Sequence, residues 1–158
     1  QSAVVKALQM AHPYETVAYE IIRLENEFQE VGSGMIGQLP GAITETAWLS
    51  LLSEVFELQL VRHTPLLHRP VRTVALCGGA GSFLTRQAIA SAADTYVTAD
   101  IKYHEFFDAN GQIVIADVGH FETEQFTVDL LYDILAEKFP TFAVFKTGVL
   151  TNPVNYYI

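Results

Sequence analysis

The stretch "VRTVALCGGAGSFLTRQAIASAADTYVTAD", residues 71–100, has the most regular structural pattern in the chain. Its β-branched beginning predicts a strand over residues 71–77, and the small residues of 78–82 predict a turn. Residues 83–93 have the pattern of a helix, and residues 95–100 again have the β-branched and aromatic composition of a strand. This order is typical of parallel strands joined by a helix.

The alternation of strands and helices continues toward the carboxyl end. Residues 102–111 predict a short helix with a turn, and residues 112–119 predict a buried strand. A helix is expected over residues 123–139, and a last strand over residues 141–148. The sequence therefore predicts an α/β fold with a mixed, partly parallel sheet flanked by helices. Ligands of such sheets bind at the carboxyl ends of the strands.

The pattern before residue 71 is less regular. The glycine-rich stretch "GSGMIGQLPG", residues 32–41, is the best candidate for a domain boundary or a crossover. The proline of His12-Pro13 ends a preceding helix, since the residue before proline avoids the helical region. The predicted elements of this part are a helix over residues 2–11, a strand over 16–24, an amphipathic helix after Thr44 and a short strand within 57–64.

The composition limits the class of protein. Of 158 residues, 50% are hydrophobic and 17% are charged, which suits a folded domain and excludes a disordered chain. A net charge of −9 disfavours binding to nucleic acid or anionic membranes. Cys77 is the only cysteine, so an internal disulfide is excluded and a cytoplasmic location is expected. No signal peptide or membrane-spanning run is found. Because the chain begins with Gln1, we expect it to be a fragment.

The stretch "GHFETEQF", residues 119–126, places His120, Glu122 and Glu124 directly after a predicted buried strand. His120 and Glu124 are four residues apart and would share one face of a helix. Imidazole nitrogen and carboxylate oxygen together suit divalent metals such as Zn, Mn or Fe. The alternative is an ordinary helix start, where acidic side chains are favoured by the helix dipole.

The stretch "TADIKYHEFF", residues 98–107, also follows a predicted strand. Asp100, Lys102 and His104 lie at its carboxyl end and could reach the same cleft as His120. The alternatives are a helix cap for Asp100 and a half-buried surface position for His104. Taken singly, Asp100 and His104 favour these alternatives, but two strand ends that each offer an acid and a histidine strengthen the case for an active site.

The turn "CGGAGS", residues 77–82, carries no nucleotide-binding motif. The dinucleotide fingerprint requires a glycine where Leu84 stands, and no lysine of a P-loop is present. A tight turn is the simpler interpretation, with contact to a small anion left open. Cys77 is expected to be buried, because no basic neighbour in the sequence would activate its thiol.

Several stretches in this order resemble one family: "AHPYETVAYEIIRLEN", "GMIGQLP", "VRTVALCGGAGS", "YVTADIKYHEFFDANG", "ADVGHFETE" and "LTNPVNYYI". They are similar to the carboxyl-terminal portion of the NGG-interacting-factor-three-like dinuclear-metal proteins, also called GTP cyclohydrolase I type 2 homologues. The resemblance covers essentially the whole chain. It implies that residues 1–31 are the last helix and strand of a PII/CutA-like insert of ferredoxin type, and that residues 32–158 are the second half of a duplicated α/β core.

The resemblance also implies roles for particular residues. His120 and Glu124 match the metal ligands of the second half of the core. Glu122 and His104 become candidate proton carriers in catalysis, and Asp100 and Lys102 are expected to line the cavity. The intact protein would bind two divalent metal ions per chain (Zn, Fe or Mn). The other ligands, among them a His-His pair and an Asp, belong to the first half of the core, and this sequence contains no adjacent histidines.

The function implied by the resemblance is that of a metal-dependent hydrolase acting on a nucleotide or a related small molecule. The alternative is a metal-binding scaffold in regulation or protein interaction, without catalysis, and a third interpretation is an α/β fragment without a working site. The expected partners are a small-molecule ligand and further copies of the protein in a toroidal hexamer, with no nucleic acid and no membrane.

Overall fold

The computed structural model describes residues 2–22 and 31–157, and the chain divides into two compact units at Val31 and Gly32. In the first unit, helix α1 (Ser2–Ala11) confirms the predicted helix, and the amide of His12 closes its last turn on the carbonyl of Leu8 at 3.0 Å. The predicted strand over residues 16–24 is wrong for residues 16–22, which form no strand, whereas residues 23 and 24 lie outside the described residues. A strand needs a partner to accept and donate its backbone hydrogen bonds, and α1 supplies none.

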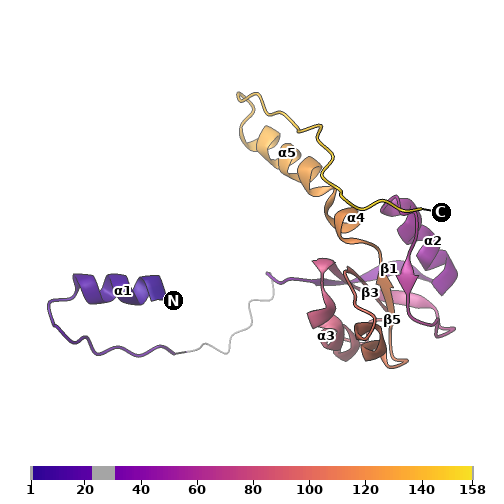
Figure 1. Cartoon of the computed structure of the whole chain (residues 1–158), viewed down its shortest axis with the longest axis horizontal. Coiled ribbons are helices and arrows are strands. Elements are labelled where there is room, and N and C mark those ends of the chain that lie inside the picture. The colour runs from indigo at the N-terminus through magenta and orange to yellow at the C-terminus, as the bar shows by residue number, and fades with distance from the viewer. Residues whose placement is uncertain (1, 23–30, 158) are drawn as a thin grey trace. The chain divides into compact units, whose positions relative to one another are not determined.

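The second unit is built around a five-stranded sheet with the order β1-β3-β4-β5-β2 (Figure 1). Strands β3, β4 and β5 are parallel, whereas the edge strands β1 and β2 pair antiparallel with β3 and β5. The prediction of a mixed, partly parallel sheet is therefore confirmed. The strands are β1 (Met35–Ile43), β2 (Arg62–His63), β3 (Val71–Ala80), β4 (Thr95–Ala99) and β5 (Val114–Asp117).

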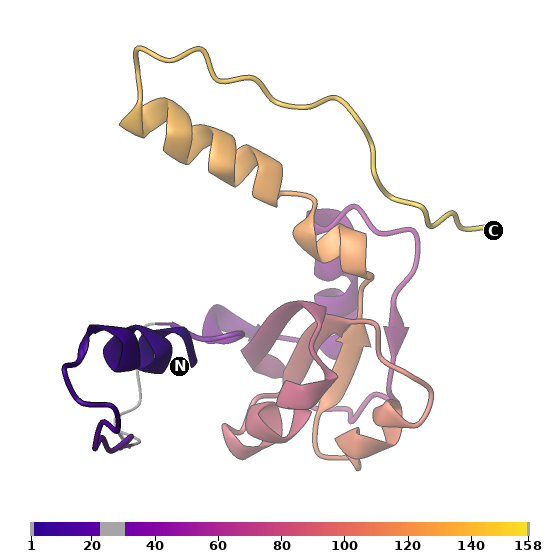
Figure 2. The same cartoon turned by 60° about the vertical axis from the view of Figure 1, so that its left-hand side comes forward.

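Helices cover both faces of the sheet (Figure 2). On one face, Trp48 and Leu52 of α2 pack with the strand residue Val97. On the other face, Ala88 of α3 packs with Tyr96, the neighbour of Val97, so the two faces alternate residue by residue as a strand requires. The helices are α2 (Glu45–Val55), η1 (Ser82–Leu84), α3 (Thr85–Ala90), η2 (Glu105–Ala109), α4 (His120–Glu124) and α5 (Thr127–Lys138).

The glycine-rich stretch 32–41 is not a crossover, because most of it belongs to β1. Gly37 and Gly41 have open space where a Cβ would stand, as expected on an exposed edge strand. Pro40 lies where the register between β1 and β3 shifts, which is a position where a strand tolerates proline. The assignment of the two units to an insert and to half a core stays a prediction.

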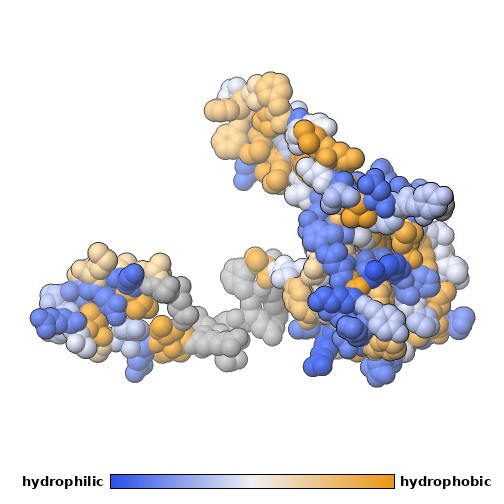
Figure 3. Space-filling view, in the orientation of Figure 1, coloured by the Kyte–Doolittle hydropathy of each residue, from blue (hydrophilic) through white to orange (hydrophobic). Residues whose placement is uncertain are grey.

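The predicted strand over residues 141–148 is wrong, because that segment forms no strand in the structure. The segment has the apolar and aromatic composition of a strand, but Phe142 and Phe145 are 74% and 88% exposed. Helix α5 likewise has no buried residue, and its apolar side chains gather on the surface (Figure 3). The apolar side chains of α5 and of residues 141–148 would be expected in a core, but the structure leaves most of them exposed. None of the helices within residues 2–22 and 31–157 has the length and apolar character to cross a membrane.

Candidate metal centre

His120 and Glu124 lie on one face of α4, which starts three residues after the end of β5. The ring nitrogen Nε2 of His120 is 3.4 Å from Oε2 of Glu124. Gly119 makes the turn into α4 with a φ of 92°, and a Cβ at this position would collide with the carboxylate of Glu122. The short strand–turn–helix connection thus orients both side chains of the predicted pair.

Asp100 orients the histidine from the neighbouring strand. It follows β4 directly, and its Oδ2 lies 2.7 Å from Nδ1 of His120. Asp100 has a φ of 55°, a left-handed conformation that is uncommon for a residue other than glycine. With a proton on Nδ1 shared with Asp100, the lone pair of Nε2 is directed away from Asp100 and toward Glu124. This arrangement of carboxylate and histidine is the one that orients metal-binding histidines in proteins.

Gly79 forms the surface against which the pair rests. A Cβ on Gly79 would come within 2.8 Å of Oε1 of Glu124 and 3.3 Å of Nε2 of His120. The amide of Gly79 donates to Oγ1 of Thr123 at 2.9 Å, and its carbonyl accepts from Oγ1 of Thr98 at 3.1 Å. Strand β3, predicted to end at Cys77, continues to Ala80, and Gly79 has a φ of 63° in the part of β3 where the register with β4 shifts.

The two donor atoms fit one face of a small divalent ion. Ligands at about 2.0–2.1 Å in tetrahedral geometry are roughly 3.3–3.4 Å apart, which is the separation of Nε2 and Oε2. The residues described by the structure contain no group of three or more His, Cys, Asp or Glu side chains able to hold a metal. The donor set therefore matches part of a metal site and does not complete one.

The surrounding carboxylates change the acid–base behaviour of His120. The hydrogen bond to Asp100 raises the pKa of His120 above its ordinary value, and the charges of Asp100 and Glu124 add to this effect. The ring thus favours a proton in the absence of a metal. Metal and proton compete for the same ring, so metal binding is expected to weaken as the pH falls.

Asp100→Asn is expected to lower the pKa of His120 in the metal-free protein, because a neutral amide no longer attracts the imidazolium. A raised pKa stabilises the folded state below the ordinary histidine pKa of about 6.5, and this stabilisation is lost as the pH rises through the folded value. The substitution should therefore remove a stabilisation present at acidic pH. An NMR titration of the His120 ring measures the change, and an unaltered midpoint would refute the role of Asp100.

A cavity of about 260 Å³ opens beside His120, and we call it the site cavity. Arg62, at the start of β2, is a positively charged residue in the lining of the site cavity. Its guanidinium donates to Oδ2 of Asp117 at 2.8 Å. Tyr156 donates to Oε1 of Glu122 at 3.3 Å; burial, and then the charge of Glu122, raise the pKa of Tyr156. The cavity is lined by Leu60, Arg62, Asp100, Asp117, Gly119, His120, Phe121, Glu122, Val154 and Tyr156.

Asp117 holds the two strand ends together. Its buried carboxylate accepts from the amide of Ile101 at 3.0 Å and from the amide of Gly119 at 3.2 Å. These amides adjoin Asp100 and His120, the two partners of the 2.7 Å contact. Asp117 is thus the residue that positions the loops after β4 and β5 against each other.

The structure brings only some of the predicted site residues together. Glu122 and Asp100 line the site cavity with His120, whereas Lys102 and His104 do not. His104 is exposed at the start of η2, with its ring 6.1 Å from that of Tyr103. The amide of Lys102 donates to Glu105, a contact that lowers the pKa of that carboxylate. Asp100 binds the histidine instead of capping η2, and the roles given to Glu122 and His104 stay predictions.

Residues that the sequence did not single out complete the surroundings of the pair. Gly79 was assigned to a tight turn, and only its position against Glu124 shows why a side chain is absent. Arg62 and Tyr156 belong to segments without a chemical motif, one within the predicted short strand and the other near the carboxyl end. The glycines of the turn 77–82 were the signal in the sequence that pointed to this part of the site, since glycine allows another group to approach the backbone closely.

The family model and the similar proteins point to the same family. Residues 4–153 match the family model described as Duf34/NIF3 (NGG1p interacting factor 3). A GTP cyclohydrolase 1 type 2 homolog of Staphylococcus epidermidis is 30% identical over 155 aligned positions, which cover 96% of this chain and 42% of that protein. The one of Halalkalibacterium halodurans is 31% identical and covers 99% and 43%. The chain thus spans about two fifths of the length of these relatives.

Solved structures agree with this result. The Bacillus cereus protein related to NIF3 superposes with a TM-score of 0.70 at 31% identity, covering 99% of this chain and 44% of that one. The Staphylococcus aureus protein SA1388 superposes with a TM-score of 0.76 at 24% identity, covering 99% and 52%, and supports the fold alone. The chain belongs to the Duf34/NIF3 (NGG1p interacting factor 3) family.

Proposed function

We propose that this chain supplies one side of a two-metal centre in a hydrolase that acts on a nucleotide or a related small molecule. The observation that carries the proposal is the 3.4 Å separation of His120 Nε2 and Glu124 Oε2, with Asp100 bound to the opposite ring nitrogen. His120 and Glu124 would be the ligands. Zn, Fe and Mn all suit this donor set, and two ions per intact protein chain are proposed.

Divalent ions in such a site lower the pKa of water and polarise the bond that is attacked. The chain's own residues would position the substrate and move protons. Glu122 lies in the site cavity and is the candidate proton acceptor, with Tyr156 holding its carboxylate at 3.3 Å. Arg62 lines the same cavity, where its guanidinium is paired with Asp117, and its remaining N–H groups are proposed to contact a phosphate group of a nucleotide.

The names of the relatives support a cyclohydrolase reaction on GTP as one candidate, and phosphoester hydrolysis is equally compatible with the site. Because the chain spans about two fifths of its relatives, the remaining ligands are proposed to come from the other half of a duplicated core. Residues 1–31 are proposed to end a PII/CutA-like insert. A cytoplasmic toroidal hexamer is the proposed assembly of the intact protein.

The proposed hydrolase is tested with the full-length protein and a panel of nucleotides, with Zn, Mn, Fe or Co added. Product formation is expected with at least one metal, and Glu122→Gln should lower kcat about 100-fold or more while the metal content stays unchanged. Glu54→Gln is the matched control, because Glu54 is exposed on α2 and lies outside the site cavity. An equal activity of wild type and Glu122→Gln would remove Glu122 from the mechanism.

A second candidate function is that of a metal-binding scaffold for protein interaction, without catalysis. The observation that favours it is the apolar surface of α5, where Leu130 is 60% exposed and Leu131 is 53% exposed. Large apolar side chains exposed together on one helix are typical of a contact surface. Bound metal together with no turnover across the nucleotide panel would support the scaffold over the hydrolase.

A further inference from the structure

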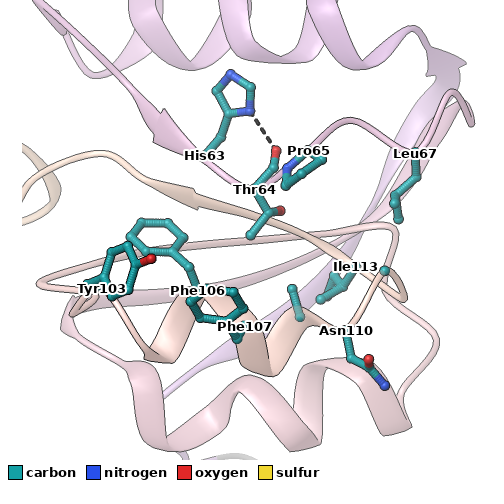
Figure 4. Close-up of a pocket in the computed structure, with 11 residues that line it drawn as sticks. His63, Thr64, Pro65, Leu67, Tyr103, Phe106, Phe107, Asn110 and Ile113 are labelled. Carbon is teal, nitrogen blue, oxygen red and sulfur yellow. Dashed lines mark hydrogen bonds between the residues drawn. The ribbon is translucent and has the colours of Figure 1, made fainter.

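A second cavity, of about 540 Å³, lies next to the edge strand β2 and shares no lining residue with the site cavity. Thr64, Pro65 and Leu67 line it on one side, and residues of η2 and its flanks line it on the other (Figure 4). We call it the aromatic cavity. Its volume lies within the range of about 300–1,000 Å³ that holds small-molecule ligands in proteins.

The side formed by η2 is a row of aromatic rings. Tyr103 is 77% exposed and Phe107 is 67% exposed, although both are large apolar side chains. Their rings meet edge to face, with centroids 5.5 Å apart and an angle of 74° between planes. Phe106 is half-buried beside them and lines the same cavity. Two exposed rings in a fixed arrangement can accept a third ring by stacking or by an edge contact.

The polar side chains that line the aromatic cavity are few: His63, Thr64, Tyr103 and Asn110. Thr64 points toward the aromatic row, whereas the ring of His63 points away from it and contacts the carbonyl of Thr64 at 2.7 Å (Figure 4). The Asn110 carboxamide lines one end, on a residue whose φ of 45° is left-handed. No Lys, Arg, Asp or Glu is among the described residues that line this cavity. A phosphate or carboxylate therefore meets no lysine or arginine there, whereas the Asn110 carboxamide can exchange a hydrogen bond with a ring heteroatom.

Arg62 and Phe106 separate the two cavities. The guanidinium of Arg62 lies 5.1 Å from the centroid of the Phe106 ring, and it also donates to Asp117 in the site cavity. The aromatic cavity needs neither the metal ligands nor their protonation state for its shape. It can therefore be tested without metal.

We infer that the aromatic cavity is a binding site for an uncharged, flat heteroaromatic ring. Tyr103 and Phe107 would contact the ring, and Asn110 would exchange a hydrogen bond with a ring heteroatom. The ring can belong to a separate ligand or to one part of a substrate that extends past Arg62. Both sources share the same recognition chemistry.

Quinoline, which is neutral at pH 7.5, is the probe, and its binding to the metal-free full-length protein is followed by NMR titration. Phe107→Ala is expected to weaken binding roughly tenfold, since it removes a ring contact. Asn110→Gly keeps the left-handed backbone and should weaken binding by a smaller factor. The matched control is Phe83→Ala, because Phe83 is 61% exposed and lies outside the aromatic cavity.

The outcomes separate the alternatives. Equal binding of quinoline by wild type and Phe107→Ala would overturn the proposed site. A Phe107→Ala protein that changes its oligomeric state while it still binds quinoline as the wild type does would also overturn it. If 1-octanol, which has no ring, binds with the same affinity as quinoline, the cavity does not select a heteroaromatic ring and the proposal is wrong. Binding that is unchanged by added Zn supports a separate ligand site, and binding that Zn changes supports a ring carried by a substrate.

Discussion

Gly79→Ala is expected to lower the metal affinity of the full-length protein roughly 100-fold, although Gly79 is not itself a ligand. The new methyl group would lie within 2.8 Å of the Glu124 carboxylate and 3.3 Å of Nε2 of His120, so both side chains must move. An alanine with a φ of 63° also costs about 1–2 kcal/mol of stability. Isothermal titration with Zn measures the affinity, and thermal unfolding measures the stability.

Gly78→Ala is the matched control for this substitution. A Cβ on Gly78 would meet Thr123 at 3.9 Å, an ordinary van der Waals distance, and Gly78 has no left-handed φ. The control should keep the wild-type affinity within about threefold and lose little stability. Equal losses in both variants would show that the backbone of β3 is merely fragile and that Gly79 has no special relation to the pair.

The central part of the fold could be predicted from the sequence because its pattern is local. Residues 71–100 alternate between strand and helix signals, and the structure forms β3, α3 and β4 there. The segments 16–24 and 141–148 have strand composition, but composition cannot show whether a partner strand is present. The stretch 32–41 has the glycine content of a linker, and the exposed edge of the sheet tolerates it as β1.

The candidate site shows the same division between local and distant information. The spacing of His120 and Glu124 predicts a shared helix face, and both lie on α4. The equal spacing of Asp100 and His104 has no such meaning, because the left-handed φ of Asp100 breaks the helical path before η2 begins at Glu105. The contact between Asp100 and His120 depends on the parallel pairing of β4 with β5. The sequence predicted that the two strand ends share a cleft, but it could not show that these two side chains meet.

The most direct test is the metal content of the full-length protein with His120→Ala and with Glu124→Ala. We expect about two ions per wild-type chain, because a two-metal site is proposed. Either substitution should reduce the metal content to one ion or fewer per chain, since each removes one of the two proposed ligands. Metal analysis after gel filtration gives the number, with His104→Ala as a control that keeps the wild-type content. An unchanged metal content in both His120→Ala and Glu124→Ala would contradict the assignment of these residues as ligands.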